Sequence, residues 1–139
     1  MDILVLIGRI LFALLFLLSA FGHLTKTKAM AGYAASKGLP AAGLAVAGSG
    51  LLLLAGGLSL LLGVWADLGA LLLAVFLVLS ALTMHRFWQE AEPMARQQEM
   101  THFQKDIALA GACLMLIAFF SYVGHDLGLT LTGPLFDIG

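Results

Sequence analysis

The sequence predicts an all-α membrane protein, a transmembrane four-helix bundle with a short interfacial helix between the first and second spans. Of its 139 residues, 61% are apolar and 11% are charged, whereas a soluble domain averages about 45–50% apolar and about 25% charged residues. The apolar residues fall into four long runs, and about 20 apolar residues are enough for one span. Because few residues lie outside these runs, we expect a single domain over residues 1–139.

The four apolar runs are predicted to be membrane-spanning helices. They cover residues 3–24, 41–65, 67–85 and 103–123. Each run of about 20 residues reaches roughly 30 Å, the thickness of the hydrocarbon core. Lipid offers the backbone no hydrogen-bond partner, so helices are expected for runs of this length. An alternative is that the first run is a secretory signal with a cleavage site near Ala29, although Asp2 and the lack of a basic start disfavour it.

Two connections between the spans are long enough to carry structure of their own. Residues 27–38 are expected to form the interfacial helix, with Met30 and Tyr33 on one face and a stop at Gly38. Residues 89–101 are polar and mixed in charge, and Pro93 either breaks or starts a helix there.

The basic residues predict how the chain is oriented. Six of the seven are in the connections after the first and third spans or at their edge, namely Lys26, Lys28, Lys37, Arg86, Arg96 and Lys105. Lysine and arginine are retained on the cytoplasmic side. We therefore expect a multi-pass protein of the bacterial inner membrane, with both termini on the periplasmic side.

Glycine and other small residues are frequent in the second span. Gly48, Gly50, Gly56 and Gly57 lie within it, and small residues let helix backbones approach closely in a membrane. The second span is therefore predicted to be the central helix with more than one neighbour. The alternative is that these glycines make room for a flat ligand.

Arg9 is the one basic residue well inside a predicted span, whereas Lys105 is at the edge of the fourth. An ionisable group at a span centre costs about 2.5–3.5 kcal/mol, so such a residue is by default a candidate for a specific role. Asp67 and Asp126 are on the same predicted side, and a structural ion pair between Arg9 and Asp67 is one interpretation. The other is that Arg9 binds an anionic or carbonyl group of a ligand.

His23, His85 and Lys105 are predicted to converge at the cytoplasmic ends of the first, third and fourth spans, with His102 as a further candidate. Histidine titrates near neutral pH, and such a group of side chains can bind and protonate a quinone carbonyl. The alternative is that these residues are interfacial and face lipid headgroups.

Other chemistry is less favoured by the sequence. The histidines and methionines around the third connection would suit copper, but their spacing matches no strong motif, so we predict no metal site. A lone cysteine, Cys113, lies in an apolar run and is expected to be inert, although a redox role for it is an alternative. No nucleotide-binding loop, catalytic triad or CxxC motif occurs, and no clustered basic face points to nucleic acid.

Several segments together resemble the DoxX family of small four-helix membrane proteins. They are GRILFALLFLLSAFGHLTK, AGYAASKGLP, LLLLAGGLSLLLG, ALTMHRFW and HFQKDIALAGA, which carry Arg9, Pro40, His85 and Lys105. The resemblance implies a membrane-embedded bundle of four helices. Some members or relatives are associated with oxidoreductase complexes, including thiosulfate to quinone electron transfer and defence against thiol oxidative stress.

Residues and resemblance together predict an integral membrane subunit of an oxidoreductase system that contacts quinone and has no covalently bound cofactor. Arg9, His23, His85 and Lys105 are the ligand-binding candidates, with Arg9 as the anchor and the others as polar or proton contacts. The alternative is a non-catalytic assembly, anchoring or lipid-binding subunit of a larger complex. Expected partners are the lipid bilayer, a quinone or lipid ligand, and oxidoreductase subunits or further copies of this chain.

Overall fold

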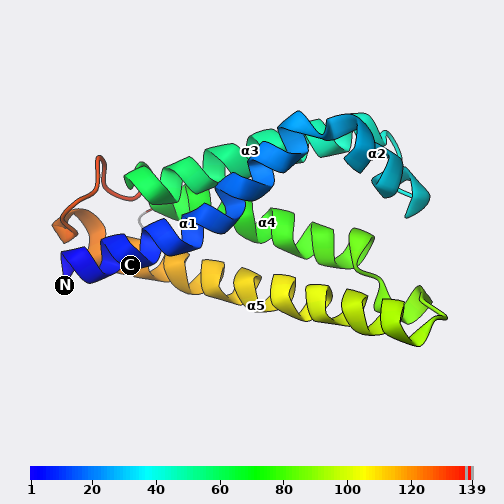
Figure 1. Ribbon diagram of the computed structural model, residues 1–139. Coiled ribbons are helices and arrows are strands. Elements are labelled where there is room, and N and C mark those ends of the chain that lie inside the picture. Colours follow the sequence, from blue (N-terminus) through cyan, green and yellow to red (C-terminus); the bar gives the residue numbers. More distant parts are fainter. Residues whose placement is uncertain (137, 139) are drawn as a thin grey trace.

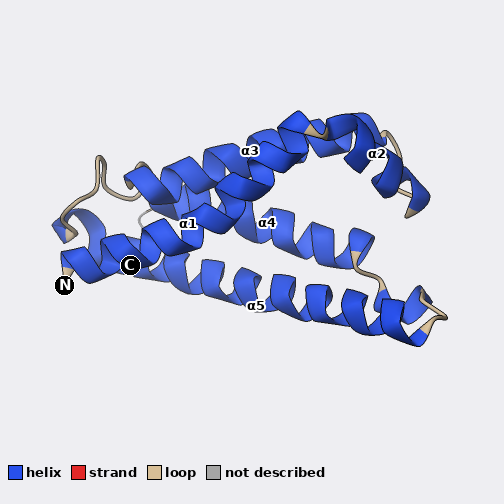
Figure 2. Ribbon diagram, in the orientation of Figure 1, coloured by secondary structure: helices blue, strands red, loops and turns tan. Residues whose placement is uncertain are grey.

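The protein is all-helical in the residues that the computed structural model describes, 1–136 and 138 (Figures 1 and 2). Its α-helices are α1 (Asp2–Thr25), α2 (Thr27–Ser36), α3 (Ala42–Leu62), α4 (Ala66–Met84) and α5 (Pro93–Val123), with short 3-10 helices η1 (Phe87–Gln89) and η2 (Gly124–Asp126). Four of them, α1, α3, α4 and α5, are long and apolar enough to cross a membrane. The predicted fold class and the four spans are therefore confirmed.

The spans pack in a row of neighbours rather than in a closed square. α1 packs on α3, α3 on α4, and α4 on α5, while α2 packs mainly on α3. α1 and α5 make few direct backbone contacts. Figure 1 shows α1 close to α5 near the N-terminus and moving away from it toward α2.

The central position of α3 depends on two adjacent glycines. A Cβ atom added at Gly56 would lie 2.7 Å from Leu73 of α4, and one added at Gly57 would lie 2.8 Å from Leu17 of α1. Both distances are too short for real contacts, so these positions need glycine for close packing on two sides. The prediction of a central second span is confirmed, and at these two positions leucine side chains fill the space that a flat ligand would need.

The helix boundaries lie within three residues of the predicted spans except at the start of α5. This helix begins at Pro93, ten residues before the predicted span. The Glu92 carboxylate accepts hydrogen bonds from the backbone N–H groups of Met94 and Ala95, at 3.1 and 2.7 Å, and proline fits the first helical position. These bonds hold the pKa of Glu92 below its usual range. At 1.5 Å per residue α5 is about 46 Å long, so its first turns extend beyond a hydrocarbon core of about 30 Å.

The predicted short helix between the first two spans is present as α2. It ends two residues before the predicted stop, with Gly38 at a φ of 86° and the N–H of Leu39 donating to the carbonyl of Ala34 at 3.1 Å. These contacts are a common helix C-terminal motif. We call the end of the molecule with α2 and η1 the α2 end.

Both termini lie at the opposite end, which we call the terminal end (Figure 1). There, residues 127–136 form a C-terminal tail that crosses the turn between α3 and α4. The N–H groups of Leu131 and Thr132 donate to the carbonyl of Gly63, and the N–H of Trp65 donates to the Thr132 hydroxyl at 2.9 Å. The tail therefore covers the point where two spans meet.

Candidate functional site

Arg9 holds the terminal end of the molecule together through backbone carbonyls. It is 3% exposed. Its Nε and Nη2 donate to the carbonyls of Leu60 and Leu61, at 2.7 and 2.8 Å, and its Nη1 donates to the carbonyl of Leu129 at 2.8 Å. The first two carbonyls belong to the last turn of α3, where a helix has no acceptor partners of its own. Arg9 thus caps α3 and fastens the C-terminal tail to it.

Gly63 makes room for this arrangement. It ends α3 at a φ of 66°, in the left-handed region that favours glycine. A Cβ atom added at this position would lie 2.7 Å from Nη2 of Arg9. Glycine is therefore needed here for two reasons, the left-handed turn and the space taken by the Arg9 guanidinium.

The predicted ion pair between Arg9 and Asp67 is wrong. Asp67 is fully buried at the start of α4, and its carboxylate accepts hydrogen bonds from the N–H groups of Leu135 and Phe136, at 2.8 and 2.6 Å. The alternative partner of Arg9, Asp126, is exposed, and Arg9 forms no ion pair within the described part of the chain. Both buried charges bond instead to backbone groups of the C-terminal tail.

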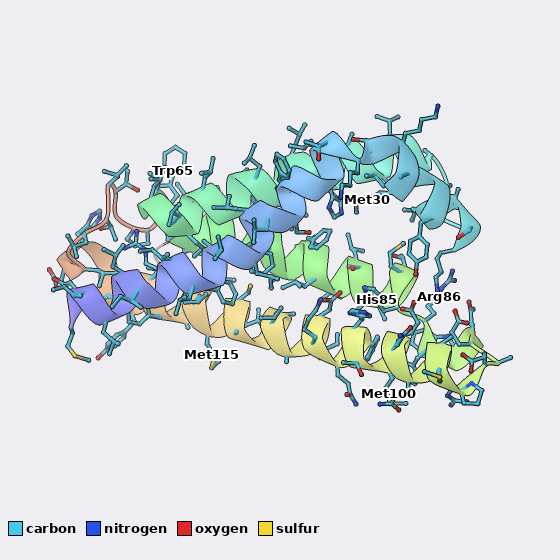
Figure 3. All side chains as sticks on the ribbon, in the orientation of Figure 1. Met30, Trp65, His85, Arg86, Met100 and Met115 are labelled. Carbon is cyan, nitrogen blue, oxygen red and sulfur yellow. The ribbon has the colours of Figure 1, made fainter. Side chains whose placement is uncertain are left out.

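A second group of charged side chains lies at the α2 end, between α2, α4 and α5. We call it the polar site; its members are Tyr33, Lys37, His85, Arg86, Glu90, Glu99, His102, Lys105 and Asp106. His85 is at its centre, between α4 and α5 (Figure 3). Its Nδ1 lies 2.7 Å from Glu99 Oε2 and its Nε2 lies 3.7 Å from Asp106 Oδ2. The ring also stacks on His102, with centroids 5.1 Å apart.

Helix α2 contributes two side chains to the polar site. The Tyr33 hydroxyl donates to Glu99 at 3.2 Å, and Lys37 Nζ lies 3.0 Å from Glu90 and 3.3 Å from Glu99. Burial and the Glu99 carboxylate raise the pKa of Tyr33. Burial lowers the pKa of Lys37, but the hydrogen bonds to Glu90 and Glu99 outweigh it, so this pKa lies above its usual value. Both side chains therefore stay protonated at neutral pH and act as hydrogen-bond donors.

Two buried atoms of the polar site lack hydrogen-bond partners. One is Oδ2 of Asp106, a residue that is 3% exposed and whose Oδ1 lies 3.4 Å from Lys105 Nζ. The other is Nε of Arg86, whose Nη2 donates to the backbone carbonyl of Lys37. An acceptor and a donor that are both buried and unmet are costly. They give the site unused capacity to bind a polar group.

Sequence reasoning found part of the polar site. His85, Lys105 and His102 come together as predicted at the α2 end. His23 does not join their contacts, because its Nδ1 bonds to the Ser19 carbonyl at 2.8 Å and its ring packs edge-on against Phe76. Glu99 and Asp106 were missed.

The missed carboxylates did leave a signal in the sequence. Glu99, His102 and Asp106 are spaced i, i+3 and i+7, which puts them on one face of a helix. The contributions of Tyr33 and Lys37 from α2 had no comparable signal, because they depend on how α2 packs. Among the described residues, no group of three or more His, Cys, Asp and Glu has the arrangement of a metal site.

Comparison with known proteins gives one match. The DoxX family model matches residues 4–86, from α1 to the second residue after α4. No curated protein and no solved structure matches the chain. The matched segment contains Arg9, His23 and His85 but ends before α5, so the resemblance of the segment with Lys105 stays a prediction. Since the match covers more than half of the chain, this membrane protein belongs to the DoxX family.

Proposed function

We propose that this protein is an integral membrane subunit of an oxidoreductase system and contacts a quinone at the polar site. The observation that carries the proposal is the position of His85 between two carboxylates, one of which, Asp106, has a buried oxygen without a hydrogen-bond partner. Titratable side chains next to unmet polar atoms suit a ligand that changes between hydrogen-bond acceptor and donor. A quinone does so when it becomes a hydroquinone.

The chemistry divides between this chain and a partner. Reduction of a quinone to a hydroquinone takes two electrons and two protons. We assign the electrons to a partner oxidoreductase subunit and the protons to His85 and Lys105, which take up protons again from water at the α2 end. A quinone carbonyl accepts a hydrogen bond from His85 or from Nε of Arg86. After reduction, a hydroquinone hydroxyl donates to Oδ2 of Asp106. Glu99 orients the His85 ring through the 2.7 Å contact to Nδ1.

A binding measurement tests the site. We expect the purified protein to bind a short-chain benzoquinone, and His85→Ala and Lys105→Ala to weaken binding. For His85→Ala the loss is about two- to tenfold, because a hydrogen bond between neutral groups contributes about 0.5–1.5 kcal/mol. Quenching of tryptophan fluorescence by the added quinone, or calorimetry in detergent, gives the affinity.

His125→Gln is the matched control for that measurement, since His125 is an exposed histidine at the terminal end and lies outside the polar site. Its affinity should equal that of the unmodified chain. Unchanged affinity in both His85→Ala and Lys105→Ala would refute quinone binding at the polar site.

A second candidate function is a non-catalytic assembly, anchoring or lipid-binding subunit of a larger complex. The exposed face of α1 favours it, because large apolar residues recur there at the 3-and-4 spacing of a helix-packing seam. The exposed residues with this spacing are Leu4, Ile7, Leu11, Leu14, Leu18 and Phe21. Purification of the protein with a stoichiometric partner that is lost when this face carries polar residues would support this function.

The orientation in the bacterial inner membrane is also a proposal. The six basic residues outside α1 support a cytoplasmic α2 end, and the two termini share the opposite end. We expect a reporter fused after residue 139 to be active when it requires the periplasm and silent when it requires the cytoplasm. The reverse pattern would invert the topology.

A further inference from the structure

A groove of about 390 Å³ runs between α1 and α5 at the terminal end, far from the polar site. Its walls include Gly8, Arg9 and Phe12 of α1 and Ala112, Leu116 and Phe119 of α5, and every lining residue except Arg9 is apolar. The volume is within the range of about 300–1,000 Å³ for small-molecule sites. Helices α1 and α5 are both long and apolar enough to span the membrane, and their backbones make few direct contacts. The groove lies in the space between them.

The charge of Arg9 has no counter-ion in the described structure. Its three hydrogen bonds all go to neutral backbone carbonyls, and a guanidinium has five N–H donors, so two N–H groups remain. A buried charge is costly unless it is paired. The one residue that breaks the apolar lining is therefore also a cation that lacks an anion.

We propose that this groove binds an anionic amphiphile of the membrane, with its carboxylate or phosphate oxygens toward Arg9 and its alkyl chain along the apolar walls. An oxyanion supplies the missing negative charge and accepts hydrogen bonds from the two remaining N–H groups of Arg9. Arginine is well suited to bind carboxylates and phosphates in this way. The alkyl chain of the ligand takes the place of bulk lipid between α1 and α5. A fatty acid and an anionic phospholipid share this chemistry, and the site is independent of quinone binding at the α2 end.

The test fills the groove without changing Arg9. A Cβ atom added at Gly8 meets no atom within 4 Å, so Gly8→Leu is expected to fold and to occupy the groove. Gly22→Leu is the matched control, because Gly22 is also on α1 and also open, about 21 Å along the helix. Native mass spectrometry counts bound oleate, phosphatidylglycerol and phosphatidylcholine on each detergent-solubilised variant.

We expect about one anionic amphiphile per chain on the unmodified protein and on Gly22→Leu, and at least tenfold weaker binding on Gly8→Leu. Retention of oleate but not phosphatidylglycerol would identify a fatty acid, and the reverse would identify a phospholipid. Equal retention of phosphatidylcholine, or equal binding by the two leucine variants, would overturn the proposal. Benzoquinone binding should be the same in both variants, so this result is separate from the test of the polar site.

Discussion

Arg9→Leu is expected to lower the free energy of unfolding by about 3–5 kcal/mol, because each hydrogen bond from a charged group contributes about 1.5–3 kcal/mol and removal of the buried cation offsets part of the loss. The substitution removes three hydrogen bonds and leaves the Leu60 and Leu61 carbonyls at the end of α3 without partners. In a membrane those carbonyls cannot turn to water. Unfolding in mixed micelles of a mild and a denaturing detergent measures the loss.

Two further variants separate the capping role of Arg9 from its charge. Arg9→Lys keeps the charge, but one ammonium cannot reach α3 and the Leu129 carbonyl as a planar guanidinium does, so an intermediate loss is expected. Arg96→Leu removes an exposed arginine of α5 and should change stability by no more than about 0.5 kcal/mol. If Arg9→Leu were as stable as Arg96→Leu, Arg9 would not be a structural cap.

The spans were predictable because lipid imposes a simple rule on length and composition. A run of about 20 apolar residues is expected to be a helix whatever its neighbours are. The same rule failed at the start of α5, where the polar residues from Pro93 onward have no apolar signal. That boundary depends on the Glu92 cap, which composition does not report.

Arg9 was singled out correctly by its position, but its partner was not. Residue types suggest that a buried cation pairs with a buried carboxylate, and Asp67 was the natural choice. In the structure Arg9 bonds to backbone carbonyls of α3 and of Leu129, and Asp67 bonds to backbone N–H groups of Leu135 and Phe136. Sequence patterns describe side chains, and they give little information about which backbone groups are left free.

The polar site was half predictable for a related reason. His85 and Lys105 stand out as charged residues at the ends of apolar runs, whereas Glu99 lies in a polar segment where one more carboxylate attracts no attention. Tyr33 bonds to Glu99 although it lies 66 positions earlier in the chain. His23 was grouped with His85 and Lys105 because the end of a predicted span indicates how deep a residue lies in the membrane. That position does not indicate its hydrogen-bond partner, which is the Ser19 carbonyl of its own helix.

Asp67→Ala is expected to destabilise the protein by about 3–5 kcal/mol, because the Asp67 carboxylate accepts two hydrogen bonds and each contributes about 1.5–3 kcal/mol. The N–H groups of Leu135 and Phe136 lose their acceptor, so the C-terminal tail should also detach from the start of α4. Asp67→Asn keeps one acceptor and should cost about half as much. Faster labelling of a cysteine placed at half-buried Phe136 reports tail detachment, with Asp126→Ala as the exposed-carboxylate control. Labelling of Asp67→Ala no faster than that of the control would mean that the tail is held without this carboxylate.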